Sequence, residues 1–228
     1  MCGRLSLFAP PSMLESRFDV DIPGSYSPRY NVAPTENLVA IRDDTPETLD
    51  FLTWGLVPHW ADDPSGSGLI NARAETLAEK PSFRDAYENR RCLVLADGFY
   101  EWREDGGVKQ PYRVCRSDDE PFAMAGLWER WEGNGEIRET ATIVTTEPND
   151  TVRPLHDRMA AILPPGEERR WLDADDEGDR ESLLSPYDGD LRAYPISTRV
   201  NDPGNDDPSI IEEVQPEGGT QSGLGDFG

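Results

Sequence analysis

The sequence predicts an α+β protein whose single domain, residues 1–215, is built on a mainly antiparallel, barrel-like β-sheet core with short peripheral helices. Three observations support this prediction. The chain has 228 residues, a length suited to one large domain or two small ones. No repeat or internal linker is evident along it. Short segments with strand character outnumber helical segments, which is typical of barrel-like antiparallel sheets.

The expected strands share short apolar or alternating patterns bounded by turn-forming residues. In chain order they cover residues 5–8, 38–42, 49–54, 92–96, 98–103, 111–115, 122–127, 137–145, 159–163 and 191–196.

Helical signals are fewer. Residues 12–18 follow a double proline. Residues 82–90 begin with Ser82 as the expected N-cap and keep three side chains on one face, those of Phe83, Ala86 and Tyr87. Further short helices are expected at residues 147–152, 167–172 and 179–184.

The C-terminal region changes in composition. Residues 201–208 are rich in Asn, Asp, Gly and Pro and predict a long loop. Ile210, Ile211 and Val214 then form an apolar patch that we expect to dock on the body. The glycine-rich residues 216–228 predict a disordered tail.

The composition is strongly acidic. Net charge is −23, with 45 acidic residues against 22 basic ones, and only Lys80 and Lys109 are lysines. Because the Debye length is only about 3 Å at 1 M salt, such a surface is tolerable in a multimolar-salt cytoplasm. An ordinary acidic protein that avoids nucleic acid is the alternative. The spread of acidic residues along the whole chain favours adaptation to salt.

The numbers of cysteines and histidines argue against a disulfide-stabilised protein and against a zinc protein. Three cysteines do not form an even disulfide framework, and Cys92 and Cys115 lie in strand-like runs as expected core residues. Two histidines cannot complete a convincing zinc site with them. We therefore expect no metal and no cofactor. Because no signal peptide and no apolar run near 18 residues is evident, we expect a soluble cytoplasmic protein without membrane contact.

The most informative position is Cys2. Removal of Met1 is usual before a small residue, and the new N-terminal cysteine would then carry two nucleophiles. The pKa of an unperturbed α-amine is about 7.7–8.0 and that of a thiol about 8.5. The amine can condense with an aldehyde to an imine, and the thiol can then close a thiazolidine ring. A buried cysteine at the start of a strand is the structural alternative.

Three further polar residues are candidates for chemistry. Asn71 shares one side of its segment with Arg73 if the segment is extended. Glu101 lies between two aromatic residues, where burial would raise the pKa of its carboxyl and suit it to proton transfer. An exposed glutamate on an alternating strand is the other interpretation, and strand period alone favours it. His156 is an acid/base candidate or a structural loop histidine, whereas His59 is interpreted as a loop residue.

Short motifs in order along the chain carry a family resemblance. The segments are Met1-Cys2-Gly3-Arg4, Arg29-Tyr30-Asn31-Val32-Ala33-Pro34, Trp54-Gly55-Leu56-Val57-Pro58, Ile70-Asn71-Ala72-Arg73-Ala74-Glu75-Thr76, Ala96-Asp97-Gly98-Phe99-Tyr100-Glu101-Trp102, His156-Asp157-Arg158-Met159 and the weaker Pro195-Ile196-Ser197-Thr198-Arg199-Val200-Asn201. The sequence closely resembles the SRAP family, the SOS-response-associated peptidases whose members crosslink to abasic sites in DNA. Ala160 departs from the proline that many members have after the His-Asp-Arg-Met run.

The resemblance implies the SRAP fold and a covalent partner, single-stranded DNA that contains an abasic site. It assigns Cys2 as the nucleophile that forms a thiazolidine with the ring-opened aldehyde. Asn71 would position the opened sugar and the amine, Glu101 would shuttle protons, and His156 would act as acid/base in ring opening. We correspondingly expect a cytoplasmic monomer that is associated with the nucleoid when it is bound to DNA.

The resemblance also implies DNA contacts and an autoprocessing step. Arg4, Arg73 and Arg158 resemble phosphate contacts, and Pro34 and Trp60 fall in segments that pack against flanking nucleotides. Autocatalytic removal of a propeptide could here concern only Met1.

Two alternative functions stay open. One is a cysteine peptidase or autoprocessing hydrolase that uses Cys2, His156 and Glu101. The other is a noncovalent sensor of damaged single-stranded DNA with aromatic side chains stacked on bases.

Overall fold

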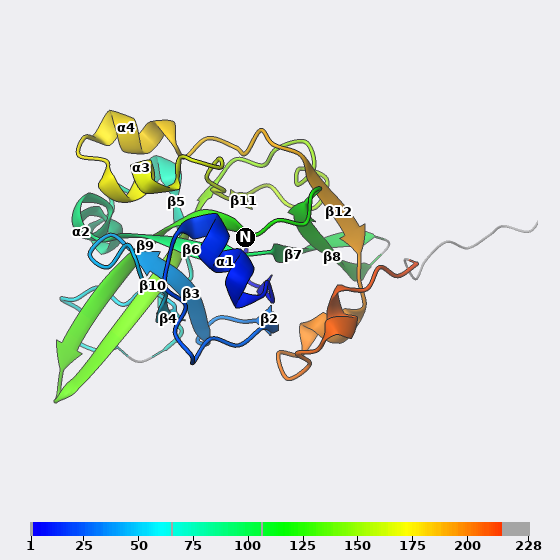
Figure 1. The fold of residues 1–228 in the computed structure, drawn as a ribbon, viewed down its shortest axis with the longest axis horizontal. Coiled ribbons are helices and arrows are strands. Elements are labelled where there is room, and N and C mark those ends of the chain that lie inside the picture. The colour runs from blue at the N-terminus through cyan, green and yellow to red at the C-terminus, as the bar shows by residue number, and fades with distance from the viewer. Residues whose placement is uncertain (1, 65, 106, 216–228) are drawn as a thin grey trace, which may run out of the picture.

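Five strands of the larger sheet pair into a closed ring, and their labels lie close together in Figure 1. The computed structural model describes residues 2–64, 66–105 and 107–215. The ring runs in the order β10 (Glu136–Thr146), β4 (Asp50–Trp54), β3 (Asn37–Arg42), β6 (Arg91–Ala96) and β9 (Phe122–Gly133). It closes because β9 also pairs with β10. The predicted α+β fold on a mainly antiparallel, barrel-like sheet is therefore confirmed.

Two short strands extend the ring at the end of β10. β5 (Asn71–Arg73) pairs in parallel with Ile143–Thr145 of β10, and β11 (Met159–Ala160) pairs antiparallel with Thr145 and Thr146. This end of β10 thus brings together two segments that are about 85 residues apart in the chain. β5 and the strand β2 (Arg29–Val32) were not among the predicted strands, since each has fewer than five residues and little apolar pattern.

A second, antiparallel sheet packs beside the ring. Its strands follow the order β12 (Leu191–Pro195), β8 (Val108–Arg116), β7 (Gly98–Asp105), β1 (Leu5–Leu7) and β2 (Arg29–Val32). The chain passes from the ring into this sheet at Asp97, between β6 and β7. The buried Asp97 carboxylate accepts hydrogen bonds from the Ser6 hydroxyl at 2.6 Å and the Ala9 backbone N–H at 3.1 Å. These bonds fix β1, and with it the N-terminal segment.

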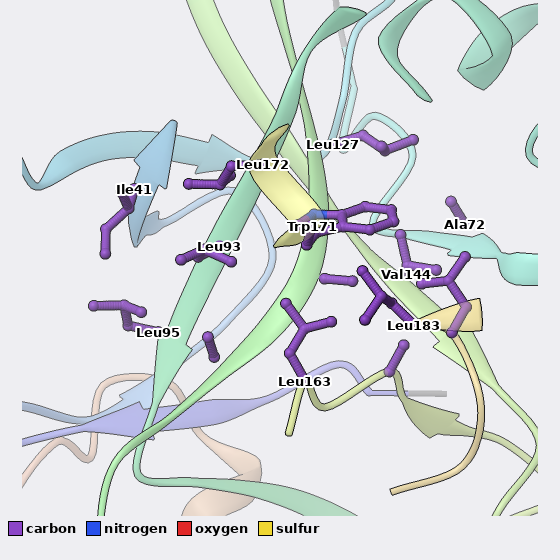
Figure 2. Packing of buried hydrophobic residues seen from close by; sticks show 14 of the residues in the cluster. Ile41, Ala72, Leu93, Leu95, Leu127, Val144, Leu163, Trp171, Leu172 and Leu183 are labelled. Carbon is purple, nitrogen blue, oxygen red and sulfur yellow. The ribbon is translucent and has the colours of Figure 1, made fainter. Parts of the chain in front are cut away.

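The strand β6 shows why a continuous apolar run occurs in this fold. All six of its residues are buried. Cys92 and Val94 belong to the cluster inside the ring, while Leu93 and Leu95 belong to a second cluster on its outer side. Figure 2 shows Trp171 and Leu172 in this outer cluster with Leu93. Burial on both faces requires apolar residues at every position.

Short helices cover the outer cluster. They are α1 (Pro11–Phe18), α2 (Pro81–Asn89), α3 (Glu168–Asp173) and α4 (Glu177–Ser182), close to four of the five predicted ranges. The 3₁₀ helices are η1 (Ala74–Thr76), η2 (Thr198–Asn201) and η3 (Pro208–Ile211). Phe83, Ala86 and Tyr87 of α2 are buried as predicted.

Two helix predictions were wrong in detail. Ser82 is not the N-cap of α2, because Pro81 takes the first helical turn and Lys80 precedes it. The helix predicted at residues 147–152 does not form, and the segment consists of turns. There the Asn149 side chain accepts a hydrogen bond from the Val152 N–H at 3.1 Å and stabilises a turn that does not continue as a helix.

The C-terminal segment docks on the second sheet, as predicted from its apolar patch. Ile210 is fully buried beside Tyr100 and Ile196. The buried Asn31 amide donates to the carbonyl oxygens of Val200, Asp202 and Asn205. The predicted tail, residues 216–228, lies outside the described residues. Within the described part of the chain, no helix has the length and apolar character needed to cross a bilayer.

Candidate functional site

Cys2 lies at the start of the N-terminal segment, which runs along β7. The antiparallel register pairs Leu5 with Phe99, and the Tyr100 N–H donates to the Arg4 carbonyl at 2.9 Å. Continuing this register brings Cys2 alongside the Glu101 region of β7. Cys2 is fully buried with the side chains inside the ring, so its structural role as a core residue and a chemical role are compatible.

Asn71 contacts Cys2 directly. Its Nδ2 donates to the Cys2 carbonyl oxygen at 2.8 Å across 69 positions of sequence. Its Oδ1 is buried and accepts no hydrogen bond from any residue that the structure describes. A buried acceptor without a partner is costly, so this oxygen is suited to an N–H or O–H donor at the site.

Glu101 is buried, with 2% of its surface exposed, against the expectation from strand alternation. Burial raises the pKa of its carboxyl to about 7, and the Asp157 carboxylate acts in the same direction. A carboxyl that titrates near pH 7 can both accept and return a proton under neutral conditions. The desolvation that the flanking aromatic residues predicted is therefore confirmed.

The Cys2 thiol has the opposite character. Burial raises its pKa to about 12, and the negative charge of Glu101 adds to this effect. The thiol is therefore protonated at neutral pH and is not a preformed thiolate.

His156 lies in the loop between β10 and β11. Its Nδ1 is 2.9 Å from the Arg158 N–H, which donates to it, and 2.8 Å from an Asp157 carboxylate oxygen. Burial lowers the pKa of the imidazole. These two contacts are alternatives: Nδ1 accepts from the Arg158 N–H when it carries no proton, and it donates to the Asp157 carboxylate when it is protonated.

An open groove joins the acid/base candidates. It has a volume of about 470 Å³ and is lined by Glu101, Trp102, Glu104, Lys109 and His156. Asn71 donates a hydrogen bond to Cys2, and the charge of Glu101 contributes to the raised pKa of the Cys2 thiol. Glu101 lines the same groove as His156. The structure thus brings together the four residues that sequence spacing alone could not connect.

The three arginines proposed as phosphate contacts differ in their surroundings. Arg73 is exposed, and its side chain has no hydrogen bond or ion pair among the described residues. Arg4 uses Nη1 to donate to Asn31 Oδ1 at 2.8 Å and to the Val200 carbonyl at 2.7 Å. Arg158 forms a two-point ion pair with Glu75. Arg73 is therefore open to a phosphate in this state, while Arg4 and Arg158 are engaged within the protein.

Trp60 projects from the loop between β4 and β5, with 56% of its surface exposed. Two contacts anchor this loop: the His59 N–H donates to Glu129 Oε2 at 2.9 Å, and Trp131 Nε1 donates to the Ala61 carbonyl at 2.8 Å. Pro34, before the turn at Thr35, is partly exposed. Both residues are accessible, and their role as DNA contacts stays a prediction.

Only one described group of side chains has a geometry suited to a metal ion: His59, Asp85 and Glu129. The Arg90 guanidinium forms ion pairs with both carboxylates of this group. It already supplies the positive charge that the carboxylates require. His59 accordingly has a structural role in the Trp60 loop.

Sequence reasoning missed two polar residues at the site. Glu75 pairs with Arg158, although it lies in the same short motif as Asn71 and Arg73. Lys109 lines the groove beside Glu101 and is one of only two lysines in the chain. That rarity was the one signal that could have marked it.

Fold and site together define a class: an α+β protein with a five-stranded closed ring and a buried cysteine at position 2, in a site with an amide, a titratable carboxyl and a histidine. Residues 1–203 match the family model described as SOS response associated peptidase (SRAP). The chain belongs to the SRAP family.

Similar proteins support this assignment. An "Abasic site processing protein YoqW" of Bacillus subtilis (strain 168) is 44% identical over 222 residues, 93% of this chain and 99% of the relative. "Abasic site processing protein YedK" of Escherichia coli (strain K12) is 32% identical over 225 residues, 94% of this chain and 100% of the relative. A crystal structure of a protein from Bacteroides thetaiotaomicron aligns with a TM-score of 0.84 at 30% identity, over 94% of this chain and 100% of that one.

Proposed function

We propose that this protein processes abasic sites in single-stranded DNA by forming a covalent thiazolidine through Cys2 after Met1 has been removed. The observation that carries the proposal is the Asn71 hydrogen bond to the Cys2 carbonyl beside a buried carboxyl whose pKa is about 7. The relatives are named abasic site processing proteins, which supports the same substrate class.

The amine is the first nucleophile in this mechanism. Because the pKa of the thiol is about 12, the sulfur is a poor nucleophile at the outset. The Cys2 amine attacks the C1′ aldehyde of the opened sugar, and water leaves as the imine forms. The buried Asn71 Oδ1 is an acceptor for an amine N–H and would hold its lone pair toward the aldehyde carbon.

Ring closure consumes the thiol. The Cys2 sulfur adds to the imine carbon, the thiol proton leaves through Glu101, and the imine nitrogen is protonated. A new C–S bond closes the five-membered ring. No oxidant or reductant is needed, and the adduct has the summed mass of protein and DNA less one water.

Glu101 and His156 supply the proton transfers. The closed hemiacetal of an abasic site must lose its hydroxyl proton and gain one on the ring oxygen before the aldehyde exists. His156 in its imidazolium form, with Nδ1 facing the Asp157 carboxylate at 2.8 Å, would donate its Nε2 proton to the ring oxygen and return to the neutral imidazole. Glu101, near its midpoint at neutral pH, is suited to move protons during imine formation and thiol addition.

DNA binding is proposed to use exposed side chains outside the groove. Arg73 is available to a phosphate, and Trp60 offers an exposed ring on which a base can stack. Recognition of a single strand fits a lesion whose sugar must enter a recessed site, because an unpaired nucleotide can leave the stack at low cost.

A peptidase activity beyond removal of Met1 has less support. Cysteine peptidases need a thiolate with a lowered pKa beside a protonated histidine. Here the pKa of the thiol is raised and that of His156 is lowered. A weak lyase activity through the same imine is compatible with the mechanism.

The proposal is tested by incubating the protein with uracil-containing single-stranded DNA that a uracil glycosylase has treated. We expect a band that survives denaturation in sodium dodecyl sulfate. Cys2→Ala keeps an N-terminal amine but lacks the thiol, so it should give only an adduct that requires borohydride trapping. A stable adduct of undiminished yield in Cys2→Ala would falsify the thiazolidine.

A further inference from the structure

An ion pair between Glu75 and Arg158 occupies one of the arginines that are proposed to contact DNA phosphates. Arg158 Nη1 lies 2.8 Å from Glu75 Oε1, and Nη2 lies 2.9 Å from Oε2. Nη2 also donates to the Thr145 carbonyl at 2.6 Å. The Arg158 side chain is 12% exposed and that of Glu75 is 53% exposed. The carboxylate therefore covers the guanidinium on its solvent side.

The geometry is that of an anion site already filled. A guanidinium binds carboxylate and phosphate through the same planar fork of two N–H donors. While Glu75 occupies this fork, a phosphodiester cannot. Arg73, two residues before Glu75, is exposed and lacks an ion-pair partner in the described part of the chain. Glu75 thus lies between two cations on a surface that a phosphate chain would approach.

Glu75 is ionised at neutral pH. Burial by itself would raise the pKa of its carboxyl, but the hydrogen bonds from Arg158, a backbone hydrogen bond and the nearby positive charges together hold the pKa below its ordinary value. The charges of Arg158 and Arg73 act in the same direction. The cover over Arg158 is therefore a charged competitor and not a neutral side chain.

We propose that Glu75 sets the affinity of this surface for phosphodiesters by competing with DNA for Arg158. Binding of a single strand opens the ion pair, the exposed Glu75 side chain rotates outward, and Arg158 pairs with a phosphate while it keeps its hydrogen bond to Thr145. This inference rests on the proposed function, since it takes single-stranded DNA as the ligand.

The test is the dissociation constant for single-stranded DNA with one tetrahydrofuran abasic analogue, which has no aldehyde and cannot crosslink. Exposed ion pairs are worth at most about 1 kcal/mol, so Glu75→Gln should bind roughly three- to fivefold more tightly than wild type. Glu79→Gln is the matched control. Glu79 lies four residues after Glu75, is exposed and has no ion pair among the described residues, so the substitution removes the same charge without freeing an arginine. Circular dichroism at the same salt confirms that each variant is folded.

A double-mutant cycle separates competition from net charge. In an Arg158→Gln background, Glu75→Gln should leave the dissociation constant within about twofold, because the competed group is gone. Weaker binding by Glu75→Gln would instead make Glu75 a positioning residue and overturn the proposal. An equal gain in Glu79→Gln, or an undiminished gain without Arg158, would also overturn it.

The outcomes also separate this inference from the proposed function. If wild type neither binds the analogue nor crosslinks to true abasic DNA, the proposed function fails. If wild type does both and Glu75→Gln binds no more tightly, only the competition by Glu75 fails.

Discussion

At the scale of single residues, burial decides the chemistry of the site more than residue type does. Glu101 and Cys2 are both enclosed, and the pKa of each is raised, to about 7 and about 12. For Glu101 the result is a group that exchanges protons at neutral pH. For Cys2 the result is a thiol that stays protonated at neutral pH.

The burial of Glu101 has a cost in stability that depends on pH. A folded-state pKa near 7, above the ordinary value near 4.5, means that the native state binds more protons than the unfolded state between these pH values. The free energy of unfolding therefore falls as pH rises through this window. Glu101→Gln should be more stable than wild type by up to about 3 kcal/mol at pH 8, with little difference at pH 4.5.

Urea unfolding of both proteins at pH 4.5 and pH 8 checks this prediction. Crosslinking by Glu101→Gln should be slower at every pH and should lose the increase near pH 7 that titration of a carboxyl produces. Equal stability at pH 8 together with an unchanged rate profile would show that Glu101 neither pays a desolvation cost nor moves a rate-relevant proton.

The role of His156 is tested with two substrates. His156→Ala should crosslink more slowly to an ordinary abasic site, because the hemiacetal must first open. The same variant should match wild type on an oligonucleotide with an acyclic aldehyde, where no ring needs to open. His59→Ala, the other histidine, should behave as wild type on both. If His156→Ala crosslinks equally slowly to both substrates, His156 acts in a step after ring opening.

At the scale of elements, the sequence predicted most strands and helices but not how they meet. The continuous apolar run of β6 and the face of α2 follow local rules, and both were correctly predicted. The burial of Glu101 was not predictable from alternation, since the segments that cover it come from the N-terminus and from the loop before β11. Short elements such as β5 depend on their pairing with β10, which is nonlocal.

The attachment of the C-terminal segment to β2 gives an element-scale prediction. Asn31 is buried and donates to three carbonyl oxygens of this segment, while its Oδ1 accepts from Arg4. Asn31→Ala leaves these groups unsatisfied and should lower the free energy of unfolding by roughly 1–3 kcal/mol. Asn37→Ala, at the exposed first residue of β3, should change the free energy of unfolding by less than about 0.5 kcal/mol. Urea unfolding measures both, and equal losses would contradict the account.

At the scale of the whole molecule, the acidic surface constrains how DNA can be bound. Phosphate contacts to single strands lose affinity with salt at a slope of about −0.7 per contact, and a net charge of −23 opposes them further at low salt. Most arginines are committed to carboxylates within the protein, as Arg158 is. Arg73 is an exception at the site, so under the proposed function we expect nonelectrostatic contacts and the proposed covalent bond to carry much of the binding.

We therefore expect the crosslink yield at long times to persist or rise between roughly 0.5 and 3 M KCl, where screening has removed most long-range repulsion. The measurement is yield against KCl concentration, with circular dichroism at each point to separate folding from binding. A yield that is highest at low salt and collapses by about 1 M, in a protein that is still folded, would contradict both the salt adaptation and this mode of binding.

The most direct test of the central claim is intact mass spectrometry of the adduct with a short single-stranded abasic oligonucleotide, followed by peptide mapping. The account predicts a protein that begins at Cys2, an adduct mass equal to protein plus DNA less one water, and stability without borohydride. Peptide mapping should locate the adduct on the N-terminal peptide. An adduct on a lysine such as Lys109, one that forms with Met1 still present, or one that requires reduction to persist would contradict it.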